Sequence, residues 1–78
     1  MRKDVFVDCT NYFNEVGCKR LKEAIETGDA VYIHIDCIGH TATMLETSRY
    51  VDWLRKTYGD KLVETKNEYG DNIYYLED

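Results

Sequence analysis

The chain has 78 residues and a net charge of −5, and 44% of its residues are hydrophobic. This is enough apolar material for one compact domain over residues 1–78, which argues against a disordered chain even though 32% of the residues are charged. The acidic balance also argues against direct binding to DNA or RNA, because that binding depends on neutralising phosphates with Lys and Arg.

The sequence predicts a cytoplasmic protein without membrane contact. No apolar run approaches the ~20 residues of a membrane helix, and the first residues lack the apolar region of a signal peptide. The three cysteines are odd in number and lack CxxC spacing, which favours reduced thiols over disulfides or a metal site. We find no glycine-rich phosphate loop, paired carboxylates or Ser/His/Asp set at a recognisable spacing, so no cofactor is predicted and a non-enzymatic role is favoured.

The chain begins with a predicted strand and helix. Apolar and polar residues alternate over Asp4–Cys9, which is typical of a strand with one buried face. Thr10 and Asn11 offer side-chain oxygens for the N-cap of a helix predicted over Tyr12–Glu26, where apolar residues fall near helical spacing. Gly28 is expected to end this helix, because glycine adopts positive φ without a Cβ penalty.

A second alternating run predicts a strand over Ala30–Cys37. One face of this strand carries Val31, Ile33, Ile35 and Cys37, and the other carries Tyr32, His34 and Asp36.

A second helix is predicted to begin between Thr41 and Thr43 and to end at Gly59. Thr43 and Glu46 have the spacing of a capping box, which would satisfy two main-chain N–H groups at the start of the helix. Its apolar stripe is expected to contain Met44, Val51, Leu54 and Tyr58, with Tyr50 and Trp53 beside it.

The last quarter of the chain predicts a hairpin. Its strands are Lys61–Lys66 and Asn72–Leu76, and the loop between them places Gly70 at positive φ. The full order is β-α-β-α-β-β. Because strand-helix-strand units are parallel and right-handed, the sequence predicts a two-layer α/β sandwich: a four-stranded mixed sheet with both helices on one face.

This element order is combined with a first helix ending in KEAIETGD, a strand ending in Asp36, a capped second helix and a closing hairpin. In these features the chain resembles the TusA/SirA-like sulfur-carrier family from about Asp4 to Leu76. The resemblance implies the same fold. In that family the first helix begins with a Cys-Pro dipeptide, and the cysteine of this dipeptide carries a persulfide. This chain has no proline, and the positions where spacing places that cysteine, Asn11 and Asn14, hold no thiol.

Cys37, His40 and Cys9 are the candidate catalytic residues if the chain is a diverged sulfur carrier. Cys9 and Cys37 should end two neighbouring parallel strands, and His40 lies three residues beyond Cys37, before a helix, where it would act as a base. The alternative, which we favour, is that both thiols continue the apolar face of their strands and are buried. A metal site at these three residues lacks a recognised spacing.

The sheet face opposite the helices is the leading candidate for partner binding. It is predicted to carry Phe6, Tyr32, His34 and one of Tyr74 and Tyr75, and aromatic residues are enriched at interfaces. The alternative is cross-strand pairing that only stabilises a solvated sheet face. We therefore expect a protein partner, and a monomer or a homodimer.

A second candidate surface is the acidic C-terminal third of the chain, formed by Glu64, Glu68, Asp71, Glu77 and Asp78. It would dock a basic protein, or imitate nucleic-acid phosphates and so inhibit a nucleic-acid-binding protein. Charged hairpin residues also keep strand edges from aggregating, and this needs no partner.

Overall fold

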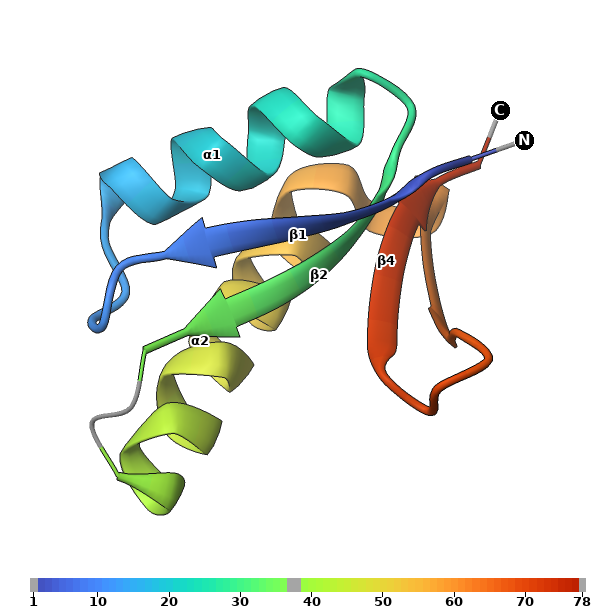
Figure 1. Ribbon diagram of the computed structural model, residues 1–78. Helices are drawn as coiled ribbons and strands as arrows, with labels where there is room; N and C mark the ends of the chain where they lie inside the picture. Colours follow the sequence, from blue (N-terminus) through green and yellow to red (C-terminus); the bar gives the residue numbers. More distant parts are fainter. Residues whose placement is uncertain (1, 37–38, 78) are drawn as a thin grey trace.

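A computed structural model describes residues 2–36 and 39–77. The strands are β1 (Asp4–Cys9), β2 (Ala30–Ile35), β3 (Leu62–Lys66) and β4 (Asn72–Leu76). The helices are α1 (Glu15–Glu26), α2 (His40–Tyr58) and the short 3₁₀ turn η1 (Gly59–Lys61). Figure 1 shows α1 above β1 and α2 behind β2. No helix in the described part of the chain is long and apolar enough to cross a membrane.

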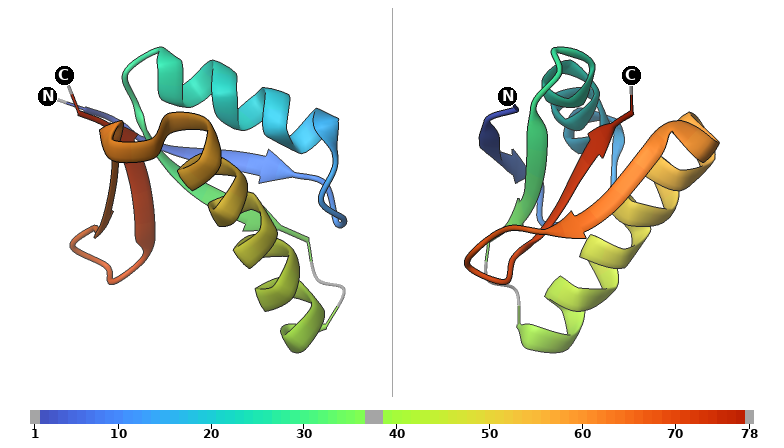
Figure 2. Two further views of the ribbon diagram at one scale, coloured as in Figure 1. Left: turned by 180° about the vertical axis from the view of Figure 1, so that it is seen from behind. Right: turned by 90° about the vertical axis from the view of Figure 1, so that its right-hand side faces the viewer.

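The four strands form one mixed sheet in the order β1-β2-β4-β3. β1 and β2 are parallel, from Asp4↔Ala30 to Cys9↔Ile35, whereas β4 is antiparallel to both β2 and β3. The two further views show α1 and α2 on the same side of this sheet (Figure 2). The predicted α/β two-layer sandwich, with its element order and its mixed four-stranded sheet, is therefore confirmed.

The core lies between the sheet and the two helices. Alternate residues of β1 and β2, among them Val7, Val31 and Ile33, are buried on the helix side, where they meet Leu21 and Leu54. Burial of each such side chain contributes about 1.5–3 kcal/mol relative to exposure. The two-residue alternation that predicted the strands therefore also selects the buried face.

α1 begins three residues later than the sequence indicated. Its N-cap is Asn14, whose side-chain oxygen accepts the N–H groups of Val16 and Gly17 at 3.0 and 3.2 Å. The prediction that Thr10 and Asn11 form the cap was wrong, because Thr10 instead donates its hydroxyl to the carbonyl of Tyr12. The end of α1 agrees with the prediction, since Gly28 follows the C-cap at φ 103°.

α2 begins at His40, with Gly39 as N-cap, so the predicted capping box does not form. The Thr43 N–H donates to the Gly39 carbonyl as an ordinary residue of the first turn. The Glu46 carboxylate instead accepts the N–H of Phe13 at 2.9 Å and pairs with Arg49. The Glu46 carboxylate is thus bonded to Phe13, which is distant in the sequence, instead of to the first turn of its own helix as the spacing suggested.

The buried side of α2 also differs from the expected stripe. Tyr50, which the sequence predicts beside the stripe, is fully buried. Met44, which it predicts within the stripe, is 60% exposed. The first turn of α2 extends past the end of β2 (Figure 1). Val51 and Leu54, further along the helix, are buried as predicted.

Tyr50 of α2 packs directly against Gly17 of α1. A Cβ atom at Gly17 would lie 2.0 Å from the Tyr50 hydroxyl oxygen. This ring has little freedom to move, because its hydroxyl donates to the Tyr12 carbonyl at 3.2 Å and lies 3.1 Å from the Thr10 hydroxyl. Phe13 packs against it edge-on at 5.0 Å between ring centroids.

We predict that Gly17→Ala destabilises the protein, although alanine favours a helix more than glycine does. The added methyl group displaces Tyr50, and such overpacking costs about 1–3 kcal/mol. Chemical denaturation measures the change in unfolding free energy. Lys19→Ala, on the exposed side of the same helix, is the control and should change stability by less than ~0.5 kcal/mol. A stabilised Gly17→Ala protein would contradict the packing described here.

We also predict that Glu46→Ala destabilises the protein by about 1–3 kcal/mol, because it leaves the Phe13 N–H without its acceptor. Glu46→Gln should lose less, since its amide oxygen still accepts that hydrogen bond. Thermal unfolding of both variants measures the difference. Equal losses in the two variants would show that the hydrogen bond to Phe13 is not the source of the stabilisation.

Candidate functional site

Three side chains form an aromatic cluster on the sheet face opposite the helices: Phe6, Tyr32 and His34. The parallel register places Phe6 beside Tyr32, with ring centroids 5.6 Å apart and planes 15° apart. The Phe6 ring also meets the His34 ring at 4.4 Å. Phe6 remains 60% exposed. The cluster therefore presents a large aromatic surface to solvent at fixed positions.

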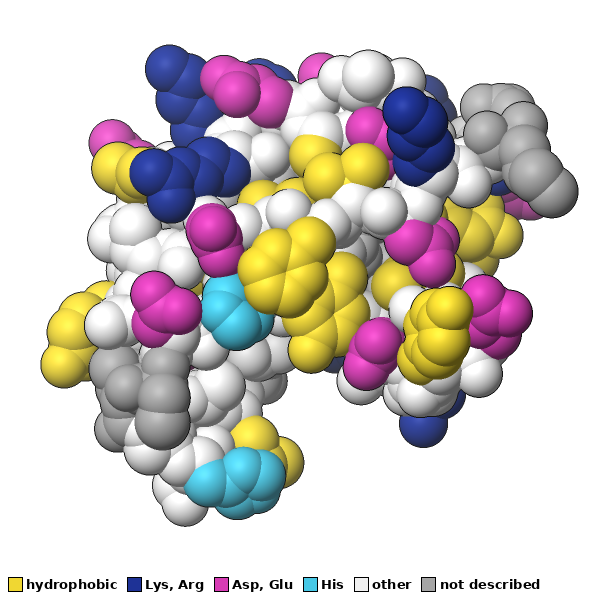
Figure 3. All heavy atoms as spheres, viewed as in Figure 1, with side chains coloured by type: hydrophobic (Ala, Val, Ile, Leu, Met, Phe, Trp, Pro, Cys, Tyr) yellow, Lys and Arg dark blue, Asp and Glu magenta, His cyan; other side chains and the backbone are white. Residues whose placement is uncertain are grey.

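Two carboxylates lie beside the histidine of this aromatic cluster. His34 Nε2 lies 3.2 Å from an oxygen of Asp36 and 4.0 Å from one of Asp8. Both carboxylates are largely exposed. Figure 3 shows hydrophobic side chains and a histidine at the centre of this face, with acidic side chains around them. The site thus combines an apolar contact surface with negative charge at its margin.

The two candidate tyrosines of β4 point to opposite faces. Tyr74 pairs with Val31 on the helix side and is only 7% exposed, and burial raises the pKa of its hydroxyl. Tyr74 therefore does not belong to the open sheet face, on which the sequence placed one of the two tyrosines. Tyr75, the next residue, lies on the open side by strand alternation. The Arg2 guanidinium sits over its ring at 4.2 Å.

Cys9 lies in the core, at the end of β1. It is 6% exposed, and burial is the main cause that raises the pKa of its thiol to about 12. Cys18 on α1 is also buried, and its thiol pKa is raised for the same reason. His40 is exposed at the first residue of α2, while Cys37 lies outside the described residues. The structure therefore gives Cys9 the properties of an unreactive packing residue.

We predict that native Cys9 reacts with iodoacetamide at pH 8 at least ~100-fold more slowly than in the denatured chain. Each unit of raised pKa lowers the thiolate fraction about tenfold, and burial also blocks access. Peptide mapping after a timed pulse separates the thiols. A fast adduct at Cys9 that disappears in Cys9→Ser would contradict this prediction and favour the carrier hypothesis.

The described acidic residues of the C-terminal third differ in their surroundings. Glu64 makes a two-oxygen ion pair with Arg55 of α2, at 2.8 Å for each nitrogen–oxygen contact. This pairing lowers the pKa of the Glu64 carboxyl. Glu68 and Glu77 are exposed, Asp71 is half-buried, and Asp78 lies outside the described residues. Within the described residues, no group of three or more His, Cys, Asp or Glu side chains could hold a metal ion.

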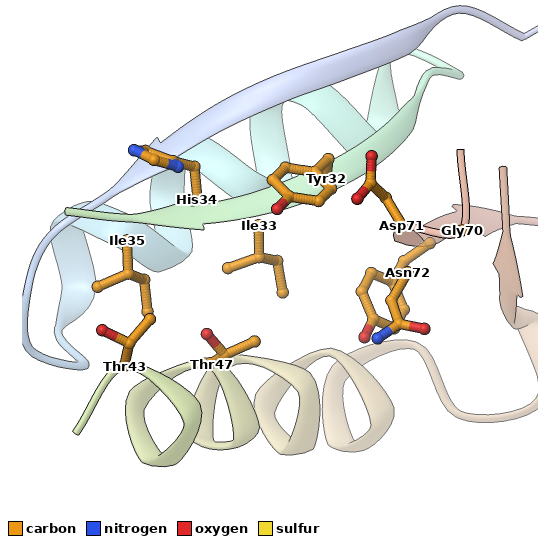
Figure 4. A pocket seen from close by; sticks show the side chains of 10 residues that line it. Tyr32, Ile33, His34, Ile35, Thr43, Thr47, Gly70, Asp71 and Asn72 are labelled. Atoms are coloured by element: carbon orange, nitrogen blue, oxygen red, sulfur yellow. The ribbon is translucent and has the colours of Figure 1, made fainter. Parts of the chain in front are cut away.

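A groove that the sequence did not predict lies between β2 and the β3–β4 hairpin. Its volume is about 270 Å³. Figure 4 shows Ile33 and Ile35 pointing from β2 toward α2, with Thr43 and Thr47 directed at them from the helix. The groove depends on how far β2 and β4 diverge, and no residue pattern within either strand signals that divergence.

Comparison with protein-family models, with curated proteins and with solved structures finds no match for this chain. The case for a function therefore depends on the residues and geometry described above.

Proposed function

We propose that this protein is a non-enzymatic interaction module that binds a partner protein through the aromatic cluster of Phe6, Tyr32 and His34. The observation that carries the proposal is the Phe6 ring, which is 60% exposed but stacked against two neighbours. Such a ring is already ordered, so a partner that covers it loses little conformational entropy on binding. Aromatic anchors of this kind supply much of the energy at protein interfaces.

The charge around the cluster indicates a basic partner. Asp8 and Asp36 lie next to His34, and the whole chain carries a net charge of −5. Charges at the margin of an interface mainly raise the association rate and exclude partners of like charge. Binding should therefore weaken as the salt concentration rises.

A cytoplasmic location and a relationship to the TusA/SirA-like family are part of the same proposal. The β-α-β-α-β-β order supports the relationship. The buried Cys9 argues against sulfur transfer through that thiol. A member of such a family without a reactive thiol at Cys9 would retain the fold and act through protein contacts.

We predict that the Phe6→Ala/Tyr32→Ala/His34→Ala variant loses a partner that the native protein captures from lysate of its own source. Removal of interface anchors costs about 2 kcal/mol or more, which corresponds to roughly a 30-fold weaker complex. Quantitative mass spectrometry of the captured proteins, followed by titration of the purified partner, measures the loss.

The matched control is Val16→Ala/Met44→Ala/Leu45→Ala, which removes exposed apolar groups from the helices instead of the open sheet face. Circular dichroism establishes that both variants are folded. Retention of every partner by the folded aromatic-cluster variant would refute the proposal, and so would equal losses in the two variants.

A further inference from the structure

β2 and β4 are joined at one end and separate at the other. In the described residues, Val31↔Tyr74 is the only residue pair between them, whereas β1 and β2 are paired along their whole length. On its β4 side, β2 from Tyr32 to Ile35 therefore has no paired residue in β4 among the described residues. This free edge is about 13 Å long at ~3.3 Å per strand residue.

The groove between these strands has a floor and two walls. Thr43 and Thr47 of α2 form the floor, beneath Ile33 and Ile35 (Figure 4). Asp71, at the end of the hairpin loop, and Asn72, the first residue of β4, form the wall opposite β2. Its volume of about 270 Å³ is at the lower end for small-molecule pockets, which are typically ~300–1,000 Å³. Its lining follows β2 from Tyr32 to Ile35, and a groove that runs along a strand fits an extended chain better than a compact ligand.

Main-chain groups at the free edge of β2 define the kind of ligand. An unpaired strand edge presents N–H and C=O groups that an incoming strand satisfies. Strand addition obtains affinity from these main-chain hydrogen bonds and specificity from alternate side chains. In this groove, one set of ligand side chains would face Tyr32 and His34, and the other set would face the threonine floor.

The charge of the groove selects the sequence of that ligand. Among the described residues, its lining includes Asp71 and no Lys or Arg, and Asp36 lies at its His34 end. Basic side chains on the Tyr32 side would therefore meet carboxylates. Small β-branched side chains on the other side would meet Ile33, Ile35 and the hydroxyls of Thr43 and Thr47.

The outer edges of the sheet are less suited to this role. On β1, Arg20 donates a hydrogen bond to the Asp8 carbonyl at 2.9 Å and so occupies part of that edge. On β3, Glu64 and Lys66 are exposed and charged, which is a common protection against strand pairing. The inner edge of β2 has neither form of protection.

We infer that the groove between β2 and β4 binds an extended basic segment of a partner protein as an added strand. The inference rests on the proposed function, because it names the class of protein that the module binds. It also assigns binding roles to Thr43, Thr47 and Asp71, which lie outside the aromatic cluster.

The test uses the full chain labelled with ¹⁵N and the blocked peptide acetyl-Lys-Val-Lys-Val-Lys-amide. Titration followed by NMR should give saturable shifts at the amides of Tyr32–Ile35 and of Gly70–Asn72. The corresponding Glu-Val peptide should bind at least tenfold more weakly. The Lys-Val peptide methylated at every main-chain nitrogen should also bind at least tenfold more weakly, because it cannot donate to the β2 carbonyls.

Matched variants locate the bound peptide. Thr47→Phe fills the floor and should weaken binding at least tenfold, whereas Ser48→Phe, on the exposed side of α2, should leave it unchanged. Asp71→Asn should weaken binding about two- to fivefold, as expected for a charge pair at the protein surface. The methylated peptide tests the main-chain contacts in the native protein, so the result does not depend on the folding of Thr47→Phe.

Three results would overturn the inference. The first is the absence of saturable shifts in the groove, and the second is equal binding of the methylated and unmethylated peptides. The third is movement of the same amides when the protein alone is concentrated, which would show that the groove pairs with a second copy of this chain.

Phe6→Ala separates this inference from the proposed function. Phe6 does not line the groove, so this variant should lose affinity for the captured partner and still bind the Lys-Val peptide. Failure of the peptide to bind, together with loss of the partner in Phe6→Ala, would overturn the groove inference alone. Unchanged partner binding in the aromatic-cluster variant would overturn the proposed function.

Discussion

The contact between Tyr50 and Gly17 joins the two helices of this protein where they pack against each other. The Tyr50 ring is fully buried beside a position where no Cβ fits, so α1 and α2 approach closely there. The Tyr50 hydroxyl also holds the loop before α1, through Thr10 and the Tyr12 carbonyl. Because Glu46 on the same helix accepts the Phe13 N–H, this loop is fixed to α2 at two points.

Placement of both helices on one face determines what the other face can do. The open face keeps its aromatic residues, and parallel pairing of β1 with β2 puts Phe6 against Tyr32 and His34. The same stacking serves stability and recognition, because ordered rings need little further ordering when a partner covers them. On the buried face, Cys9 is enclosed by the core, and burial raises the pKa of its thiol.

The groove and the aromatic cluster share β2. Arg55 of α2 binds Glu64 of β3, which anchors the hairpin to the second half of the helix. The first half of α2 continues past this anchor, beneath the edge of β2 that β4 leaves unpaired (Figure 1). Because Tyr32 and His34 belong to both, the aromatic cluster and the groove form one continuous candidate surface for a protein ligand.

Local patterns determined much of the fold: the alternation of β1 and β2, the hairpin with Gly70 at positive φ, and the end of α1 before Gly28. They also placed Phe6, Tyr32 and His34 on one face, since alternation depends only on neighbouring residues. Tertiary structure alone decided the partner of Glu46, the burial of Tyr50 and Tyr74, and the opening beside β2. These features depend on contacts between residues distant in sequence and on the angle between strands, which no local spacing records.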